Sequence, residues 1–343
     1  ADGHSLGGPF YYIERGMGAK WKWLGKMFAF FGVCVGLFGI GTFSQVNGIS
    51  SAIQNFFDPE KANCVTIPFL GEYSWAVVIS SLILAFCVAA ILIGGLQRIA
   101  TVSQIIVPFM AVIYFGFSIA LILFHIREVP AAVVTVVNGA FNPAAVTGGV
   151  VGSMIVAMQK GVARGIFSNE AGLGSAPIAA AAAQTKEPVR QGLVSMTGTF
   201  IDTIVICSCT AFILLLVPEE FTRRLMGMEL LQTAMNYHLG SFGVVFVAVI
   251  LALFSFSTFL GILFYARSNV SYLFGNRWLW QTLYKILALV MLFIGGIQTY
   301  TVVWDLGDVG IGLMTIFNLA VLIPLSGEAL SALAEYEKLR AHQ

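Results

Sequence analysis

The chain has 343 residues, of which 58% are hydrophobic and only 10% are charged, and its formal net charge is +1. Soluble domains carry about 25% charged residues, so a chain with so few charges requires lipid as its main solvent. The near-zero charge gives no indication of a nucleic-acid partner. The apolar stretches run for about 18 residues or more with little alternation, which favours transmembrane helices and excludes outer-membrane barrel strands.

Hydropathy predicts eight transmembrane helices in a single membrane domain, residues 1–343. Segment 1–25 precedes the first span. In segment 218–240, charges mix with Leu and Met at helical spacing, which predicts a short amphipathic helix at the membrane surface. The predicted spans, in chain order, are about 26–53, 73–95, 103–125, 146–167, 193–217, 241–265, 277–297 and 309–327.

The distribution of Lys and Arg predicts the orientation of these spans. If segment 1–25 is cytoplasmic, fourteen of the 18 Lys and Arg residues fall on the cytoplasmic side and four on the other. This bias predicts a cell-membrane protein with both termini in the cytoplasm and helix 218–240 outside. The five cysteines are scattered and odd in number, which indicates neither a disulfide framework nor a metal site.

Polar side chains at membrane depth are costly and mark candidate functional positions. Gln45 and Asn47 lie in the first span, about 200° apart on an ideal helix, so we expect at most one of them to face a pocket. The other is then expected to bind a neighbouring helix. The fourth span carries small residues that fit either close helix packing or a helix break. They are Gly148, Gly149, Gly152 and Ser153.

Two later spans also carry polar groups. In the fifth, Asp202 is a lone carboxylate that needs a partner, a proton or water. In the sixth, Ser257 and Thr258 follow Phe254, whose carbonyl lies one turn back on the same helix face. Three neutral oxygens suit sodium, which is a hard cation, whereas the alternative is that both hydroxyls simply bond back to the helix.

Residues 161–177, GVARGIFSNEAGLGSAP, form a polar, Gly-rich stretch between apolar flanks. Together with GGPFYYIERGMG (7–18) and AAAAAQTKEPVRQGLVSMTGTFIDTIVICSCTAF (179–212), this stretch resembles the alanine or glycine:cation symporter family. The segments NVSYLFG (269–275) and GLM (312–314), with Asn318, agree more loosely. The resemblance covers nearly the whole chain.

The resemblance implies an all-α integral membrane fold, the leucine-transporter-type inverted-repeat bundle, and symport of alanine or glycine with sodium by alternating access. In this family GGPFYYIE lies between the second and third helices. The chain is therefore expected to run from the third helix onward and to need the first two helices as a partner. By itself it is expected to bind neither amino acid nor sodium. No organic cofactor is implied.

The same resemblance places residues 161–177 at the inner end of the sixth helix and in the following loop, where a gate must open and reseal. Glycines permit close backbone approach and hinging there. We expect Arg164 and Glu170 to form a breakable cytoplasmic latch, with Asp202 as a further gating residue; the alternative is a static, solvated loop.

On this interpretation Gln45 or Asn47, with the backbone of 148–153, contacts the substrate, and Phe254, Ser257 and Thr258 bind sodium. Three positions depart from the family pattern: Ile262, Ile311 and Phe317. Two other functions are open. One is a truncated, non-transporting membrane remnant. The other is an intramembrane hydrolase, which is disfavoured because the spans carry no HExxH and no GxSxG motif. Alanine or glycine, and sodium or proton, are also open alternatives.

Overall fold

The computed structural model describes residues 7–39, 41–68, 70–93, 95–141, 150–183, 185, 187–222 and 225–341. These residues are almost entirely helical, and seven segments among them are long and apolar enough to cross a membrane. Large apolar side chains such as Phe86, Val112 and Phe124 point outward, as they do in a lipid-facing surface. The chain is therefore a multi-pass, all-α membrane protein, as the hydropathy predicts.

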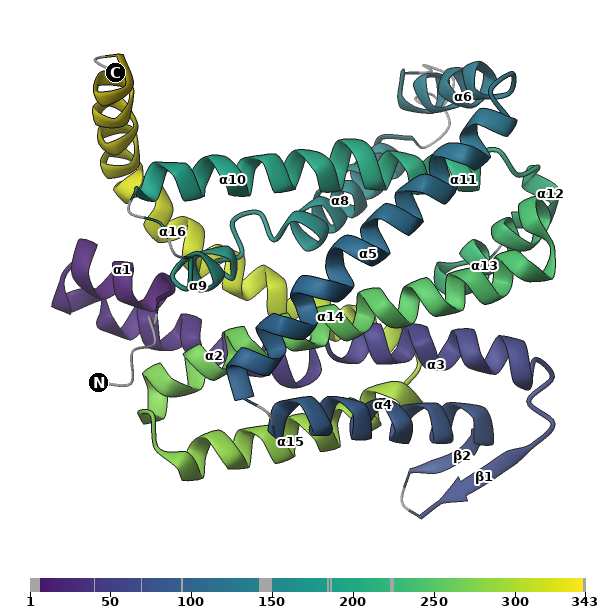
Figure 1. Ribbon diagram of the computed structural model, residues 1–343, viewed down its shortest axis with the longest axis horizontal. Helices are drawn as coiled ribbons and strands as arrows, with labels where there is room; N and C mark the ends of the chain where they lie inside the picture. Colours follow the sequence, from purple (N-terminus) through teal and green to yellow (C-terminus); the bar gives the residue numbers. More distant parts are fainter. Residues whose placement is uncertain are drawn as a thin grey trace.

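The elements follow one another closely along the chain (Figure 1). The first half contains α1 (Pro9–Gly16), the 3-10 turn η1 (Ala19–Trp21), α2 (Lys22–Phe38), α3 (Phe43–Phe57), β1 (Cys64–Ile67), β2 (Gly71–Ser74), α4 (Trp75–Ile93), α5 (Gly95–Phe124) and α6 (Val129–Phe141). The second half contains α8 (Val150–Asn169), α9 (Ala176–Ala180), α10 (Pro188–Phe200), the π-helical segment η2 (Ile201–Cys207), α11 (Ser208–Leu215), α12 (Glu219–Thr222), α13 (Gly227–Leu239), α14 (Ser241–Phe274), α15 (Trp278–Ile297) and α16 (Tyr300–Ala341).

Seven of the eight expected spans coincide with one of the candidate membrane segments. The remaining one, 146–167, begins outside the described residues, and its described part belongs to α8. Segment 218–240 contains two helices, α12 and α13, and α13 buries Gln232, Ala234 and Met235 against its neighbours. The antiparallel hairpin β1–β2 and α12 lie at one end of the long axis, whereas α1 and α9 lie at the other (Figure 1).

The first predicted span is not one continuous helix. It is divided into α2 and α3, and the chain between them leaves helical geometry at Gly39 and Gly41. Gly39 is extended, and Gly41 has φ +87°, a left-handed conformation that favours glycine. A Cβ on Gly41 would lie 2.1 Å from Cγ1 of Ile262 in α14, so this close approach also requires glycine. Hydropathy does not reveal this break, because the stretch is mostly apolar and its mean hydropathy stays high.

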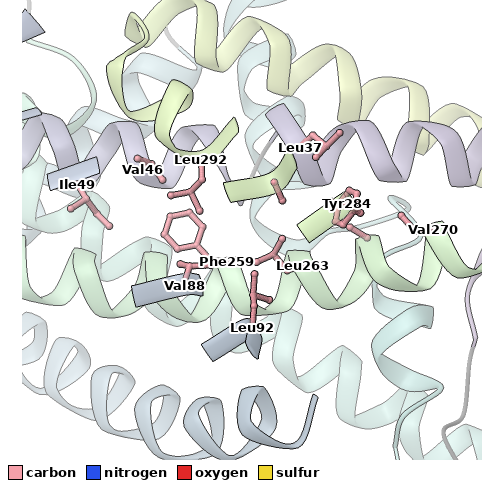
Figure 2. Close-up of a cluster of buried hydrophobic side chains, with 12 residues drawn as sticks. Leu37, Val46, Ile49, Val88, Leu92, Phe259, Leu263, Val270, Tyr284 and Leu292 are labelled. Atoms are coloured by element: carbon pink, nitrogen blue, oxygen red, sulfur yellow. The ribbon is translucent and has the colours of Figure 1, made fainter. Parts of the chain in front are cut away.

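The larger apolar core gathers around α14. Figure 2 shows Phe259 surrounded by Val46, Val88 and Leu292, which come from α3, α4 and α15. All four side chains are buried. Because α3, α4 and α15 all pack against α14 here, the position of α14 relative to α3 is fixed, and both of these helices contribute to the lining of the site described below.

A second core lies at the end of the molecule that carries α1. It joins Phe10 and Ile13 of α1 to Phe28 of α2, Leu173 of the 170–175 loop and Val321 of α16. The motif segments 7–18 and 161–177, far apart in sequence, therefore share one apolar cluster.

Candidate functional site

A cavity of about 620 Å³ lies where α3, α14, the start of α13 and the start of α16 meet. Its deep part is formed by buried side chains, among them Asn47 and Ser255. Aromatic side chains complete the wall: Phe167 from α8, Phe254 from α14, and Tyr300 and Trp304 from α16. A concave site with neutral polar groups beside aromatic rings is suited to a small polar ligand.

One wall of the cavity is the polar face of α3. Its members recur at helical spacing and carry hydroxyl or amide groups, with one glycine between them. They are Ser44, Gln45, Asn47, Gly48, Ser51, Gln54 and Asn55. Both Gln45 and Asn47 line the cavity, so the expectation that only one of them faces a pocket is wrong. Gln45 lies in the first turn of α3, beside the break between α2 and α3.

Each of these two amides also has a structural partner. The backbone N–H of Gly41 donates to Oε1 of Gln45 at 2.8 Å, so the side chain satisfies a backbone group that the helix break exposes. Nδ2 of Asn47 donates to the carbonyl of Gln298 at 2.7 Å, which ties α3 to the end of α15. Asn47 therefore combines the two alternatives, pocket lining and contact with a neighbouring helix, whereas Gln45 combines pocket lining with a local bond to the helix break.

The opposite wall is one face of α14, formed by Leu251, Phe254, Ser255 and Thr258. Oγ of Ser255 is buried and has no hydrogen-bond partner among the described residues, although it borders the cavity. A buried hydroxyl without a partner is costly unless water or a ligand reaches it. Sequence reasoning did not assign Ser255 to the site, and only its spacing three residues before Thr258 indicates the shared face.

The three oxygens predicted to bind sodium lie together. Oγ of Ser257 and Oγ1 of Thr258 donate to the carbonyl of Phe254, at 2.8 and 2.9 Å. Thr258 borders the cavity, whereas Ser257 does not; its Oγ lies 3.8 Å from Sδ of Met110 in α5. In this conformation both hydroxyls are hydrogen-bonded to the Phe254 carbonyl, but each hydroxyl oxygen keeps lone pairs that can coordinate a cation.

Arg164 pairs with Asp308 and not, as predicted, with Glu170. Its Nη2 lies 2.6 Å from Oδ2 of Asp308, and its guanidinium lies 4.4 Å from the ring centroid of Trp304, in a cation–π arrangement. The eight-span assignment places Arg164 and Asp308 at opposite membrane faces. Their contact shows that the boundaries of the fourth and eighth spans cannot both be as predicted.

Glu170 has a different partner. Oγ of Ser175 donates to its carboxylate at 2.5 Å, within the same loop. Burial raises the pKa of the Glu170 carboxyl, and the hydrogen bond from Ser175 partly opposes that shift. Glu170 also has φ +52°, a left-handed conformation that is uncommon for a residue other than glycine.

Two of the four glycines in 161–177 are explained by their backbone conformation and by close packing. Gly172 and Gly174 both have positive φ, at +74° and +92°. A Cβ on Gly174 would lie 2.7 Å from Cγ of Pro9 and 2.8 Å from Cε2 of Phe28. Gly174 therefore allows the loop to pack directly against α1 and α2.

Asn318 connects three segments that the sequence keeps far apart. Its Nδ2 donates to the carbonyl of Gly172 at 2.7 Å, and its Oδ1 accepts a hydrogen bond from the hydroxyl of Tyr12. Asn318 is buried. The loop, α1 and α16 are thus joined through one amide.

Asp202 lies on the π-helical segment η2, and its partner is Ser168, whose Oγ donates to it. The next residue, Thr203, donates to Oδ1 of Asn169 at 2.8 Å. The end of α8 is therefore attached to η2 by two consecutive contacts. π-Helical segments are rare and recur at functional sites.

The small residues predicted to contact the substrate belong to the fourth predicted span. Gly148 and Gly149 lie outside the described residues, and Gly152 and Ser153 belong to α8.

The whole chain, residues 1–343, matches the sodium:alanine symporter family. The chain belongs to this family. It is 45% identical over 326 residues to an uncharacterized transporter of Haemophilus influenzae, with 94% of this chain and 67% of that protein covered. It is 36% identical to the sodium/alanine symporter AgcS of Methanococcus maripaludis, over 100% of this chain and 72% of the relative. It is also 36% identical to the probable sodium/glutamine symporter GlnT of Bacillus subtilis, over 97% and 65%. The chain thus spans about two thirds of the length of these relatives.

The three departures from the pattern of the sodium:alanine symporter family are packing residues. Ile311 belongs to the core around α1, Phe317 stacks on Phe31 with ring centroids 5.5 Å apart, and Ile262 abuts Gly41. None of the three borders the cavity among the residues that the structure describes. These three positions therefore lie in the packing between helices and not in the lining of the cavity.

Proposed function

We propose that this chain forms the main part of a sodium-coupled symporter for small neutral amino acids, alanine or glycine, which works by alternating access. The observation that carries this proposal is the shared cavity, in which the polar face of α3 lies opposite Phe254, Ser255 and Thr258 of α14. Membership of a transporter family supports transport over hydrolysis. The names of AgcS and GlnT, an alanine and a probable glutamine symporter, support a neutral amino acid as the substrate class.

We assign substrate contacts to Gln45 and Asn47, with the backbone of α8 around Gly152 and Ser153 and the preceding Gly148 and Gly149 as further candidates. An amide that already holds a backbone partner is oriented before the ligand arrives, which reduces the entropy lost on binding. Phe167 and Trp304 add aromatic surface to the same cavity, against which a small apolar side chain such as the methyl group of alanine can pack.

Sodium is assigned to the oxygens of Phe254, Ser257 and Thr258. Thr258 presents its hydroxyl to the cavity, where the carboxylate of a bound amino acid can approach the ion. Such an arrangement couples the two solutes, because each raises the affinity for the other by the same factor. The Phe254 carbonyl becomes a ligand only when the two hydroxyls turn away from it.

Gating is assigned to Arg164 with Asp308, to Glu170 and to Asp202. The ion pair holds Trp304 in the cavity wall through the cation–π contact, so breaking the pair releases that wall. Glu170 and Asp202 fix the two ends of the loop that follows α8 through Ser175 and Ser168. We further propose that both termini are cytoplasmic, with α12 and α13 on the outer side.

The test uses the complete gene product reconstituted in lipid vesicles. Labelled alanine, glycine and glutamine are supplied outside with an inward sodium gradient, a proton gradient, or neither. We expect sodium-driven accumulation of alanine or glycine above that of glutamine. Equal uptake with and without sodium, or no uptake at all, contradicts the proposal and favours the non-transporting remnant.

A further inference from the structure

Only two of the described residues that border the 620 Å³ cavity carry a formal charge, Lys61 and Glu229. Both side chains are exposed, whereas Asn47 and Ser255 in the deep part are buried. The two charges therefore mark the solvent-facing mouth. Neither forms an ion pair within the part of the chain that the structure describes.

Lys61 lies in a turn that is closed by hydrogen bonds to Asp58. Asp58, which is buried, accepts hydrogen bonds from the backbone N–H of Ala62 at 2.9 Å and from Oγ of Ser74 at 2.5 Å. The N–H of Lys61 itself donates to the Asp58 carbonyl at 3.1 Å. The loop before β1 is thus tied to the end of β2, and Lys61 is presented to the mouth from a fixed support.

Glu229 approaches from a different element, the first turn of α13. A carboxylate in that position interacts favourably with the helix dipole. Glu229 also borders a second cavity of about 410 Å³, together with Asn55, Gln232 and Asn236. No other charged residue lines this second cavity among the described residues. Asn55 and Glu229 are common to both cavities, so Glu229 stands where the second cavity adjoins the mouth.

We propose that Lys61 and Glu229 form a charge filter at the mouth, which favours zwitterionic amino acids over anionic and cationic ones. A zwitterionic amino acid can place its carboxylate near Lys61 and its ammonium group near Glu229. Among the described residues that border the cavity, none beyond the mouth carries a formal charge, so the side-chain charge of an anionic or cationic amino acid would be unpaired there, which is costly. The inference rests on the proposed function, because it concerns entry to the same cavity.

Removing the charge of Glu229 and removing that of Lys61 should shift the charge selectivity of the mouth in opposite directions. Without the charge of Glu229 the mouth is net positive and attracts anions; without that of Lys61 it is net negative and attracts cations. Both variants lose one favourable contact with a zwitterion. Because the two side chains are exposed, the expected change in affinity is about two- to fivefold.

The experiment measures sodium-driven alanine uptake by the complete gene product in vesicles, with aspartate and 2,4-diaminobutyrate as competitors. We expect Glu229→Gln to raise the KM for alanine about two- to fivefold at an unchanged maximal rate, and to strengthen competition by aspartate relative to diaminobutyrate. We expect Lys61→Gln to raise KM similarly and to shift competition the other way.

Matched controls lie on the same elements or beside them. Glu60→Gln removes a charge next to Lys61, and Glu220→Gln removes one from α12; neither residue borders the cavity, and both variants should retain wild-type behaviour. The charge-swapped double variant Lys61→Glu with Glu229→Lys should recover a KM near that of the wild type. If both single variants keep the wild-type KM and competitor ratio, the filter is wrong although the transport function stands. If the wild type shows no sodium-driven uptake, the proposed function itself fails.

Discussion

Arg164 forms an ion pair with Asp308, 144 residues further along the chain, and the same guanidinium lies over the ring of Trp304. The pair is about one third exposed on each side, so its charge–charge energy is modest in isolation. Its importance lies in position: one face of Trp304 meets Arg164, and Trp304 also borders the cavity.

Replacing Asp308 by Asn should therefore impair transport. The change keeps the shape but removes the charge that holds Arg164, one of whose nitrogens, Nη1, is already buried without a partner among the described residues. We expect sodium-driven uptake to fall about three- to tenfold. Asp305→Asn is the control, because Asp305 is exposed and lies on the same helix without an ion pair among the described residues. Equal uptake rates for both variants would show that Asp308 has no role in gating.

Asn318 should be essential for stability. Asn318→Leu deletes both of its hydrogen bonds and leaves the Tyr12 hydroxyl and the Gly172 carbonyl without their partner, at a cost of about 2 kcal/mol or more. Tyr12→Phe deletes only one of the two and should cost about 1 kcal/mol. Thermal unfolding in detergent measures both. The double variant should lose less than the sum of the two single changes, whereas strict additivity contradicts the contact.

The close approach of Gly174 to Pro9 and Phe28 can be tested by comparing the stability of two Gly→Ala variants. Gly174→Ala introduces a Cβ within 2.8 Å of Pro9 and Phe28 at a residue whose φ is +92°, so we expect a loss of about 1–3 kcal/mol in unfolding free energy. Gly165→Ala, in α8, meets nothing within 4 Å and should be neutral or slightly stabilising. A similar melting temperature for the two variants would show that the loop does not pack against α1 and α2 as described.

These relationships show how far the sequence predicts the molecule. Apolar runs locate seven segments that the structure bears out, because hydropathy depends on local composition alone. Gly39 and Gly41 interrupt the first of them, but glycines within an apolar run leave the mean hydropathy high. The polar face of α3 has a helical period, and Gln45 and Asn47 predict part of it from the sequence.

The long-range partners could not be predicted in the same way. Tyr12 and Asn318 are 306 residues apart, and nothing in either local sequence indicates the other. Glu170 is the nearest acid to Arg164 in the motif, so proximity in sequence suggested the wrong pair. Which faces of two helices meet depends on the packing of the whole bundle, as with Phe259 among three neighbouring helices.

His238 should make the part of the molecule around α13 sensitive to acid. Burial lowers the pKa of this imidazole below its ordinary 6.5; the His125 ring, 4.8 Å away between centroids, lowers it further, whereas the Ile213 carbonyl and Glu128 act in the opposite direction. The unfolded chain then binds more protons than the folded one as pH falls below about 6.5, so stability declines there and is unaffected above.

The measurement is the melting temperature between pH 8 and pH 5. We expect the wild type to lose more stability on acidification than His238→Gln, whose amide can still donate to the Ile213 carbonyl but cannot gain a proton. Nδ1 of His238 is buried without a partner among the described residues, so a proton placed there has no acceptor. Parallel pH profiles for the two proteins would contradict this role.

The central claim is that sodium and the amino acid meet in the cavity between α3 and α14, and the sodium dependence of alanine uptake by Thr258→Val tests it most directly. Valine preserves the shape of Thr258 but removes the hydroxyl that borders the cavity. The account predicts that the sodium concentration for half-maximal uptake rises at least about tenfold, a loss of roughly 1.4 kcal/mol. A sodium dependence identical to that of the wild type would contradict it and leave the hydroxyl as a group that only bonds back to its own helix.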